Sequence, residues 1–123
     1  MVVDRMLTTI DSYKLSREHH TALRLGRHLL AGGAQAELGT ELPGNEAHFV
    51  EEERDLLPLL DADRRRALTE RLRAEHAQLR LLFAAALNGR DEAQAGQALI
   101  DHVRFEEREL FPVLEALFEE TRP

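Results

Sequence analysis

Histidine and glutamate recur at matched positions in two stretches of this chain. The first stretch begins at His48 and reads HFVEEERDLLPLL, and the second begins at His102 and reads HVRFEERELFPVL. In both, a glutamate follows the histidine by four residues, which pairs His48 with Glu52 and His102 with Glu106. Because residues four apart lie on the same face of an α-helix, each pair would project side by side from one helix.

A second histidine precedes each stretch, in the dipeptides Glu18-His19 and Glu75-His76. The chain therefore looks like one two-helix unit used twice. The set of candidate metal ligands is His19, His48, Glu52, His76, His102 and Glu106. Nitrogen and oxygen ligands of this kind suit a pair of first-row metal ions, iron and manganese above all, with zinc as a further alternative. The chain has no cysteine, so thiolate ligands are excluded.

The elements that must position these residues are predicted to be helices, because apolar residues recur at helical spacing and strand patterns are absent. The first helix is expected to start near Leu15, with Ser16 as its N-cap, and to stop at Gly32-Gly33. Residues 1–14 precede it as an N-terminal arm that could join this helix. Residues 34–45 contain two glycines and a proline and are predicted to form a loop, although residues 34–38 could extend the helix.

The second helix is predicted to start near Asn45, and Pro58 is expected to kink its last turn or end it. Asp61 or Asp63 would cap the third helix, which Asn88-Gly89 stops, and Asp91 would cap the fourth. Four amphipathic helices joined mostly by short loops favour an all-α fold, an up-down-up-down antiparallel four-helix bundle over residues 15–120.

The candidate ligands interrupt apolar stripes on these helices, so they are predicted to point inward. A buried, ionised carboxylate is costly without a partner, and no Lys or Arg lies on the stripes of the second and fourth helices to neutralise Glu52 or Glu106. A metal would compensate them, and the alternative is a metal-free bundle with ordinary core histidines. Residues outside the pattern are predicted to be surface charges or to have secondary roles: His20, His28, Glu51, Glu53 and Glu109.

Composition narrows the classes of function. Sixteen basic and 23 acidic residues give a net charge of −7, which disfavours nucleic acid and anionic membranes as partners. A chain of 123 residues is expected to form one compact domain. No apolar run approaches the roughly 20 residues that span a bilayer, and no signal peptide is evident, so we expect a soluble cytoplasmic protein.

With these residues in view, the chain resembles the hemerythrin-like HHE cation-binding domains from about Leu15 to Leu117. The resemblance rests on the two Glu-His dipeptides, the two His-x-x-x-Glu motifs, and Leu57-Pro58 and Phe111-Pro112 after them. It implies a non-haem di-iron site inside a four-helix bundle. The histidines would be terminal ligands, and Glu52 and a carboxylate of the fourth helix would bridge the metals.

Two departures from the oxygen-carrying members stand out. Those carriers have a second histidine one turn after the ligand of the third helix, where this chain has Arg80, so their five-histidine site is absent. Arg80 could form a salt bridge at the bundle edge or reach inward toward an anionic ligand. The carriers also place the fourth-helix carboxylate five residues after its histidine, which would select Glu107. The internal repeat favours Glu106, because Glu107 lies roughly 100° further around the helix, and Glu107 stays the alternative.

Two histidines per metal and two shared carboxylates leave coordination positions open. The resemblance therefore implies a protein that binds, senses or detoxifies a small ligand such as dioxygen, peroxide or nitric oxide. The alternative is an iron-handling or iron-sensing module whose metal occupancy controls a protein partner. The sequence leaves open whether the protein is an enzyme.

Overall fold

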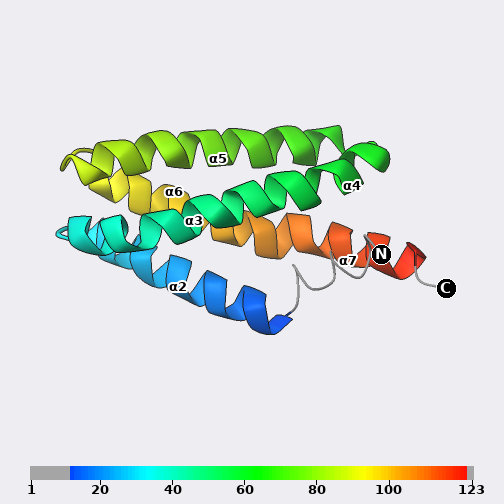
Figure 1. Ribbon diagram of the computed structural model, residues 1–123, viewed down its shortest axis with the longest axis horizontal. Coiled ribbons are helices and arrows are strands. Elements are labelled where there is room, and N and C mark those ends of the chain that lie inside the picture. The colour runs from blue at the N-terminus through cyan, green and yellow to red at the C-terminus, as the bar shows by residue number, and fades with distance from the viewer. Residues whose placement is uncertain (1–11, 122–123) are drawn as a thin grey trace.

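The computed structural model describes the backbone of residues 12–121 and the side chains of residues 18–117; most of the predicted N-terminal arm lies outside the described residues. Every described element is helical, which confirms the all-α class. The elements are α2 (Ser12–Ala31), α3 (Gln35–Asp55), α4 (Leu57–Ala62), α5 (Arg66–Leu87), α6 (Glu92–Phe105), the π-helix η1 (Glu106–Leu110) and α7 (Phe111–Thr121). They form four long helical rods in a bundle, in which α4 continues α3, and η1 and α7 continue α6 (Figure 1).

The first helix starts before the predicted N-cap, Ser16. Helix α2 begins at Ser12, so Ser16 lies within the helix and is not its N-cap, and the last three residues of the predicted arm are helical. The predicted stop is confirmed, because Gly32 and Gly33 follow the helix with φ angles of 93° and 80°. Side chains other than hydrogen rarely tolerate this left-handed region, so the glycines permit the sharp turn into α3.

The predicted loop over residues 34–45 is wrong, because α3 runs through it from Gln35. Pro43 lies inside the helix, and the Asn45 amide donates a hydrogen bond to the carbonyl oxygen of Glu41, one turn earlier. Leu38 is fully buried in the apolar core. Burial of a leucine side chain stabilises the fold by about 1.5–3 kcal/mol, which can offset the weak helix preference of the surrounding glycines.

Both prolines of the repeat lie at the start of a new helix. Helix α3 ends at Asp55, and Pro58 occupies the first turn of α4, so the predicted break is confirmed. Pro112 lies correspondingly in the first turn of α7, after the π-helical turn η1. Proline is tolerated there because the first amides of a helix have no intrahelical acceptor.

None of the aspartates predicted to cap the later helices makes a side-chain capping hydrogen bond. Helix α5 begins at Arg66 without a side-chain cap, so neither Asp61 nor Asp63 caps it. Asp61 accepts a hydrogen bond from the Thr69 hydroxyl instead. Asp91 does precede α6, but its side chain makes no capping hydrogen bond and its φ is 55°.

Two apolar clusters divide the core along the helices. One contains Leu56, Leu72 and Phe105, and the other contains Phe49, Leu79 and Leu99. On α3, on α5 and on the fourth rod, a buried polar residue lies in the chain between members of the two clusters: Glu52, His76 and His102. The fold thus places a polar layer across the middle of an apolar core.

Helices α2 and α6 approach each other closely at two glycines. A Cβ atom added to Gly96 would lie 2.5 Å from the carbonyl oxygen of Gly26, a distance at which the backbones would have to move apart. This contact sets the separation of the helices that carry His19 and His102.

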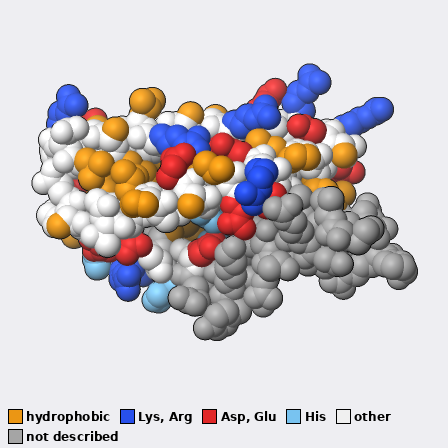
Figure 2. Space-filling view, viewed as in Figure 1, with side chains coloured by type: hydrophobic (Ala, Val, Ile, Leu, Met, Phe, Trp, Pro, Cys, Tyr) orange, Lys and Arg blue, Asp and Glu red, His pale blue; other side chains and the backbone are white. Residues whose placement is uncertain are grey.

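Charged side chains of both signs are spread over the exposed face seen in Figure 2, with apolar side chains between them. Within the part of the chain that the structure describes, no helix has the length and apolar character needed to cross a membrane.

Candidate metal centre

The first repeat places Glu52 between histidines of two helices. Oε2 of Glu52 lies 3.3 Å from Nε2 of His48, one turn earlier on α3. Oε1 of Glu52 lies 3.1 Å from Nε2 of His76 on α5. Only 1% of the Glu52 surface is exposed, and His76 is fully buried against the stacked ring of Phe49, whose centroid is 4.2 Å away. One carboxylate therefore joins two histidines in the interior.

The second repeat places Glu106 between histidines of two helices. Oε1 of Glu106 lies 3.5 Å from Nε2 of His19 on α2 and 3.7 Å from Nε2 of His102 on α6. Glu106 is 1% exposed and begins the π-helical turn η1. The structure thus brings all six candidate ligands of the sequence into one polar layer, with the Nε2 atom of each histidine facing a central carboxylate.

Glu52 and Glu106 lie against each other in the interior, and their pKa values move in opposite directions. Burial and the negative charge of Glu52 raise the pKa of Glu106 to about 8, and a hydrogen bond joins the two groups. Burial alone would raise the pKa of Glu52, but hydrogen bonds from Glu106, His48 and His76 lower it well below its ordinary value. Two adjacent buried carboxyl groups cannot both ionise without a large cost in free energy, so one of them keeps its proton.

Neighbouring carboxylates raise the pKa values of three histidines in the layer. Burial alone would lower the pKa of His48, but hydrogen bonds to Glu18 and Glu52 raise it to about 11. Carboxylates similarly raise the pKa values of His19 and His102 against the opposing effect of burial. The raised pKa values favour the protonated, positively charged form of these histidines beside the buried carboxylates.

The same residues fit a metal centre. Two groups of three bring their ligand atoms within 4.8 Å of one another: Glu52 with His76 and His102, and His48 with Glu52 and Glu106. Glu52 belongs to both groups. Four buried atoms in this layer make no hydrogen bond within the described structure: Nε2 of His19, Nε2 of His102, Oε2 of Glu52 and Oε2 of Glu106. Buried polar atoms are normally satisfied, and a cation bound in this layer would satisfy these four.

A second layer of carboxylates surrounds the histidines on their Nδ1 side. Nδ1 of each ring lies within 3.3 Å of an outer glutamate oxygen, and each of these glutamates lies on another helix than the histidine that it holds. The pairs are His19 with Glu107 at 3.3 Å, His48 with Glu18 at 2.8 Å, His76 with Glu53 at 2.6 Å, and His102 with Glu75 at 2.7 Å. Such partners fix the tautomer and orientation of a ligating histidine.

Comparison with known families agrees with this arrangement. The family model of the hemerythrin HHE cation-binding domain matches residues 11–114, which is most of the chain. The chain belongs to the hemerythrin HHE cation-binding domain family. Comparisons with curated proteins and with solved structures gave no match.

The sequence did not predict the second layer of carboxylates in this HHE domain. Glu53 was predicted to be a solvated helix charge, but its carboxylate accepts a hydrogen bond from Nδ1 of His76 and binds Arg80. Hydrogen bonds from His76 and Arg80 lower the pKa of Glu53 against the effect of its burial. The doublet Glu52-Glu53 was the available signal, because adjacent helical residues can face a histidine of another helix from two sides.

Glu107 belongs to the second layer of carboxylates. Its Oε2 receives the hydrogen bond from His19, its Oε1 accepts one from Arg104 at 3.1 Å, and its side chain is 39% exposed. Glu106 instead lies at the centre, as the internal repeat indicated.

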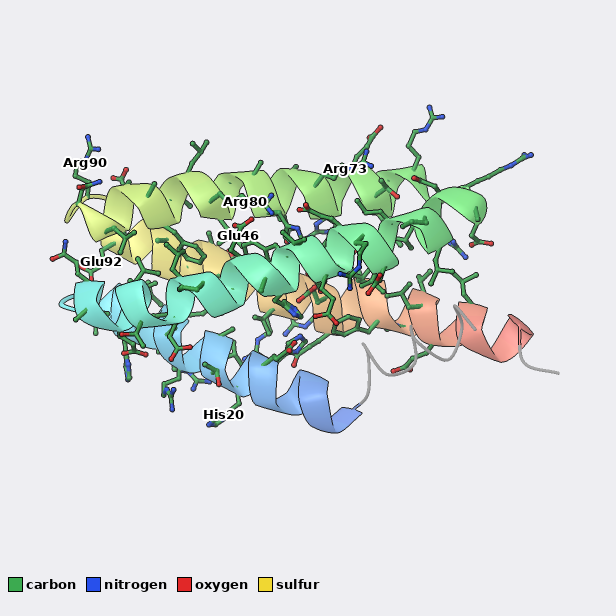
Figure 3. All side chains as sticks on the ribbon, in the orientation of Figure 1. His20, Glu46, Arg73, Arg80, Arg90 and Glu92 are labelled. Atoms are coloured by element: carbon green, nitrogen blue, oxygen red, sulfur yellow. The ribbon has the colours of Figure 1, made fainter. Side chains whose placement is uncertain are left out.

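Arg80 points away from the centre of the HHE domain. Its guanidinium group binds both carboxylate oxygens of Glu46, at 2.9 and 3.1 Å, and donates to Glu53 at 3.1 Å; Figure 3 shows Arg80 and Glu46 close together between α5 and α3. Arg80 therefore forms the salt bridge at the bundle edge that the sequence offered as one of its two roles.

Arg71 has an equivalent position one turn before Glu75. It donates to Glu75 and to Glu109, both at 2.8 Å, and its guanidinium carbon lies 4.1 Å from the ring centroid of Phe105. Arg71 and Arg80 thus each hold the carboxylate that holds a histidine of the centre.

The two remaining histidines lie outside the centre. His20 is exposed and points away from the bundle (Figure 3). Nδ1 of the exposed His28 donates to Glu37 at 2.6 Å, near the turn between α2 and α3.

Proposed function

We propose that this HHE domain holds two iron ions and binds a small oxygen-containing or nitrogen-oxide ligand at them. The observation that carries the proposal is the polar layer in which four histidine Nε2 atoms face two shared, buried carboxylates. Nitrogen and oxygen donors with no thiolate suit iron, with manganese and zinc as alternatives.

The geometry supports a division of the ligands between the two ions. Glu52 and Glu106 would be shared. His76 and His102 would hold one ion, because both neighbour Glu52 in the first compact group. His19 and His48 would hold the other ion, since each lies beside one of the two shared carboxylates. This set supplies two histidines and two carboxylates to each ion.

Bound iron would supply redox activity and coordination positions that a dioxygen, peroxide or nitric oxide molecule can occupy. The protein's own part is to orient the ligand atoms. Glu18, Glu53, Glu75 and Glu107 hold the imidazole rings at Nδ1, so that Nε2 faces the centre. The apolar clusters flank the polar layer on both sides.

A second candidate is an iron-sensing module, in which metal occupancy controls a protein partner. It is favoured by the buried pair Glu52 and Glu106, whose carboxyl groups a bound cation would compensate. Loss of metal would therefore change the charge of the layer that joins all four rods. For the bundle itself we propose the up-down-up-down topology, supported by the short connections at residues 32–34 and 88–91.

Anaerobic reconstitution with ferrous iron, followed by metal counting and an optical spectrum after oxidation, tests the proposal. We expect two ions per chain and an oxidised spectrum typical of a carboxylate-bridged pair. A limit of one tightly bound ion would contradict the dinuclear site. Consumption of added peroxide would favour ligand chemistry over sensing, and metal-dependent capture of a defined partner without consumption would favour sensing.

A further inference from the structure

Exposed apolar side chains gather on the face that α3 and α5 form together, which is the face shown in Figure 2. Leu81 of α5 is 74% exposed and Val50 of α3 is 49% exposed, the two highest values among the large apolar side chains that the structure describes. Exposed alanines one turn away on the same helices complete this apolar patch: Ala47, Ala77 and Ala84. Single exposed apolar residues are ordinary, but a group of them on one face marks an interaction surface.

The charges beside the apolar patch are paired within the chain. Arg80 is the only charged residue of α5 between Ala77 and Ala84, and its guanidinium group binds Glu46 and Glu53 of α3. Figure 3 shows Arg80 and Glu46 together on this face. Because these groups satisfy one another, covering them would leave no charge buried without a partner. The middle of the face is therefore suited to burial, although the whole chain has a net charge of −7.

The face is large enough for a dimer interface. Helix α3 has 21 residues and α5 has 22, and each residue adds about 1.5 Å to the length of a helix. Two neighbouring helices with axes about 8–10 Å apart present a surface roughly 20 Å wide. An overlap of roughly 25–30 Å along the helices would bury about 1,000–1,200 Å² over both copies, which reaches the area of about 1,000 Å² that a specific interface needs.

We propose that a second copy of this chain packs on the α3/α5 face and forms a two-fold dimer, in which α5 lies antiparallel to α5 of the other copy and Leu81 lies near the axis. A two-fold interface uses the same surface on both copies, so it must be complementary to itself. The apolar patch and its internally paired charges meet this requirement.

The arginines at one end of the face decide the orientation of the two copies. Arg54 at the end of α3 and Arg73 of α5 lie toward the same end, beyond the contact between Glu53 and His76. If the copies pointed the same way, Arg73 of one copy would meet Arg54 of the other. The antiparallel arrangement keeps these cations at opposite ends and also opposes the dipoles of the two α5 helices.

The dimer would cover one side of the polar layer and leave the other side open. The covered side contains Arg80 and Glu53, which holds Nδ1 of His76. The cavity of about 430 Å³ that reaches His19 and His48 is lined by residues of α2, α3 and α6 and by none of α5. The proposed interface contains none of the six central ligands, so the dimer does not depend on bound metal.

Analytical ultracentrifugation of the full chain over a concentration series from micromolar to millimolar tests the proposal. We expect a mass that rises to twice the 14.0 kDa of one chain, in chelator-treated and in iron-loaded samples alike. Leu81→Lys should weaken dimerisation by about a hundredfold or more, because it places two like charges near the axis and removes the apolar contact. Leu30→Lys is the matched control, since Leu30 lies on α2, is 41% exposed and is outside the patch; it should leave dimerisation unchanged.

A mixture of two variants tests the position of the axis. Leu81→Lys and Leu81→Glu should each be monomeric alone and should dimerise with each other when mixed, because position 81 of one copy faces position 81 of the other. Circular dichroism of each variant checks that the helices are intact, as expected for a side chain so exposed. An unmodified chain that stays monomeric throughout the series, or a dimer that Leu81→Lys leaves intact, would overturn the proposal. A mixture that stays monomeric would overturn the antiparallel arrangement.

Discussion

Nδ1 of His76 lies 2.6 Å from Oε2 of Glu53, and the same oxygen accepts a hydrogen bond from Arg80 at 3.1 Å. A carboxylate at the edge of the bundle thus connects a guanidinium group to a fully buried histidine. This contact holds the His76 ring on its Nδ1 side, and Nε2 on the other side faces Glu52 at 3.1 Å.

Glu53→Gln should lower metal affinity by about 10- to 100-fold, the usual effect of losing the outer partner of a ligating histidine. The amide cannot hold the imidazole as a carboxylate does. Competition with a chelator measures the change. Glu70→Gln on the exposed face of α5 is the matched control and should have no effect. Equal affinities for the two variants would show that Glu53 is only a surface charge.

Arg80→Gln should have a smaller effect on metal affinity, roughly tenfold or less, because Arg80 acts on His76 only through Glu53. Azide affinity of the metal-loaded protein should not change, since the Arg80 guanidinium pairs with Glu46 and Glu53 at the bundle edge. Titration with azide checks this directly. A large loss of azide affinity would mean that the guanidinium reaches the centre after all.

Glu106→Ala should reduce metal occupancy much more than Glu107→Ala. Glu106 is buried among the histidines, whereas Glu107 holds His19 from a partly exposed position. Occupancy is read by elemental analysis after reconstitution, with Glu52→Ala expected to match Glu106→Ala and Glu109→Ala expected to match the unmodified protein. The reverse order for positions 106 and 107 would place the shared carboxylate at Glu107.

Metal loading should raise the unfolding temperature. An ion that binds only the folded protein adds about 2.7 kcal/mol at a free concentration of 100 times its Kd, and it also compensates the buried carboxylates. Thermal unfolding monitored by circular dichroism, with and without a chelator, measures the difference. Identical transitions would argue for a metal-free bundle.

The metal-free protein should become less stable as the pH rises from 7 to 10. The folded pKa of Glu106 is raised from 4.5 to about 8, so its stabilising effect is complete below 4.5 and lost as the pH approaches 8. The folded pKa of His48 is raised from 6.5 to about 11, so its effect is complete below 6.5 and lost as the pH rises through 11. Both pKa shifts therefore lower the free energy of unfolding as the pH rises.

Unfolding temperatures of metal-free protein at constant ionic strength test this pH dependence. Glu106→Gln, which has no proton to lose, should flatten the part of the curve below about pH 8. A metal-free protein that gains stability between pH 7 and 10 would contradict the raised pKa values of Glu106 and His48.

The sequence alone determined the helical class and the six central residues, because both follow from local spacing. A four-residue offset fixes that His48 and Glu52 share a helix face, and the repeat of that offset at His102 and Glu106 required no knowledge of the fold. The family resemblance rested on the same local motifs, and the family match confirmed it.

Tertiary structure decided what local propensity could not. Pro43 and Gly44 favour a loop, yet burial of Leu38 keeps α3 helical through them, since packing energy exceeds intrinsic preference. The role of Glu53 and the outward direction of Arg80 likewise depend on which helices are neighbours. Spacing within a helix fixes angles about its own axis, but the partner of a side chain across the bundle is set only when the helices pack.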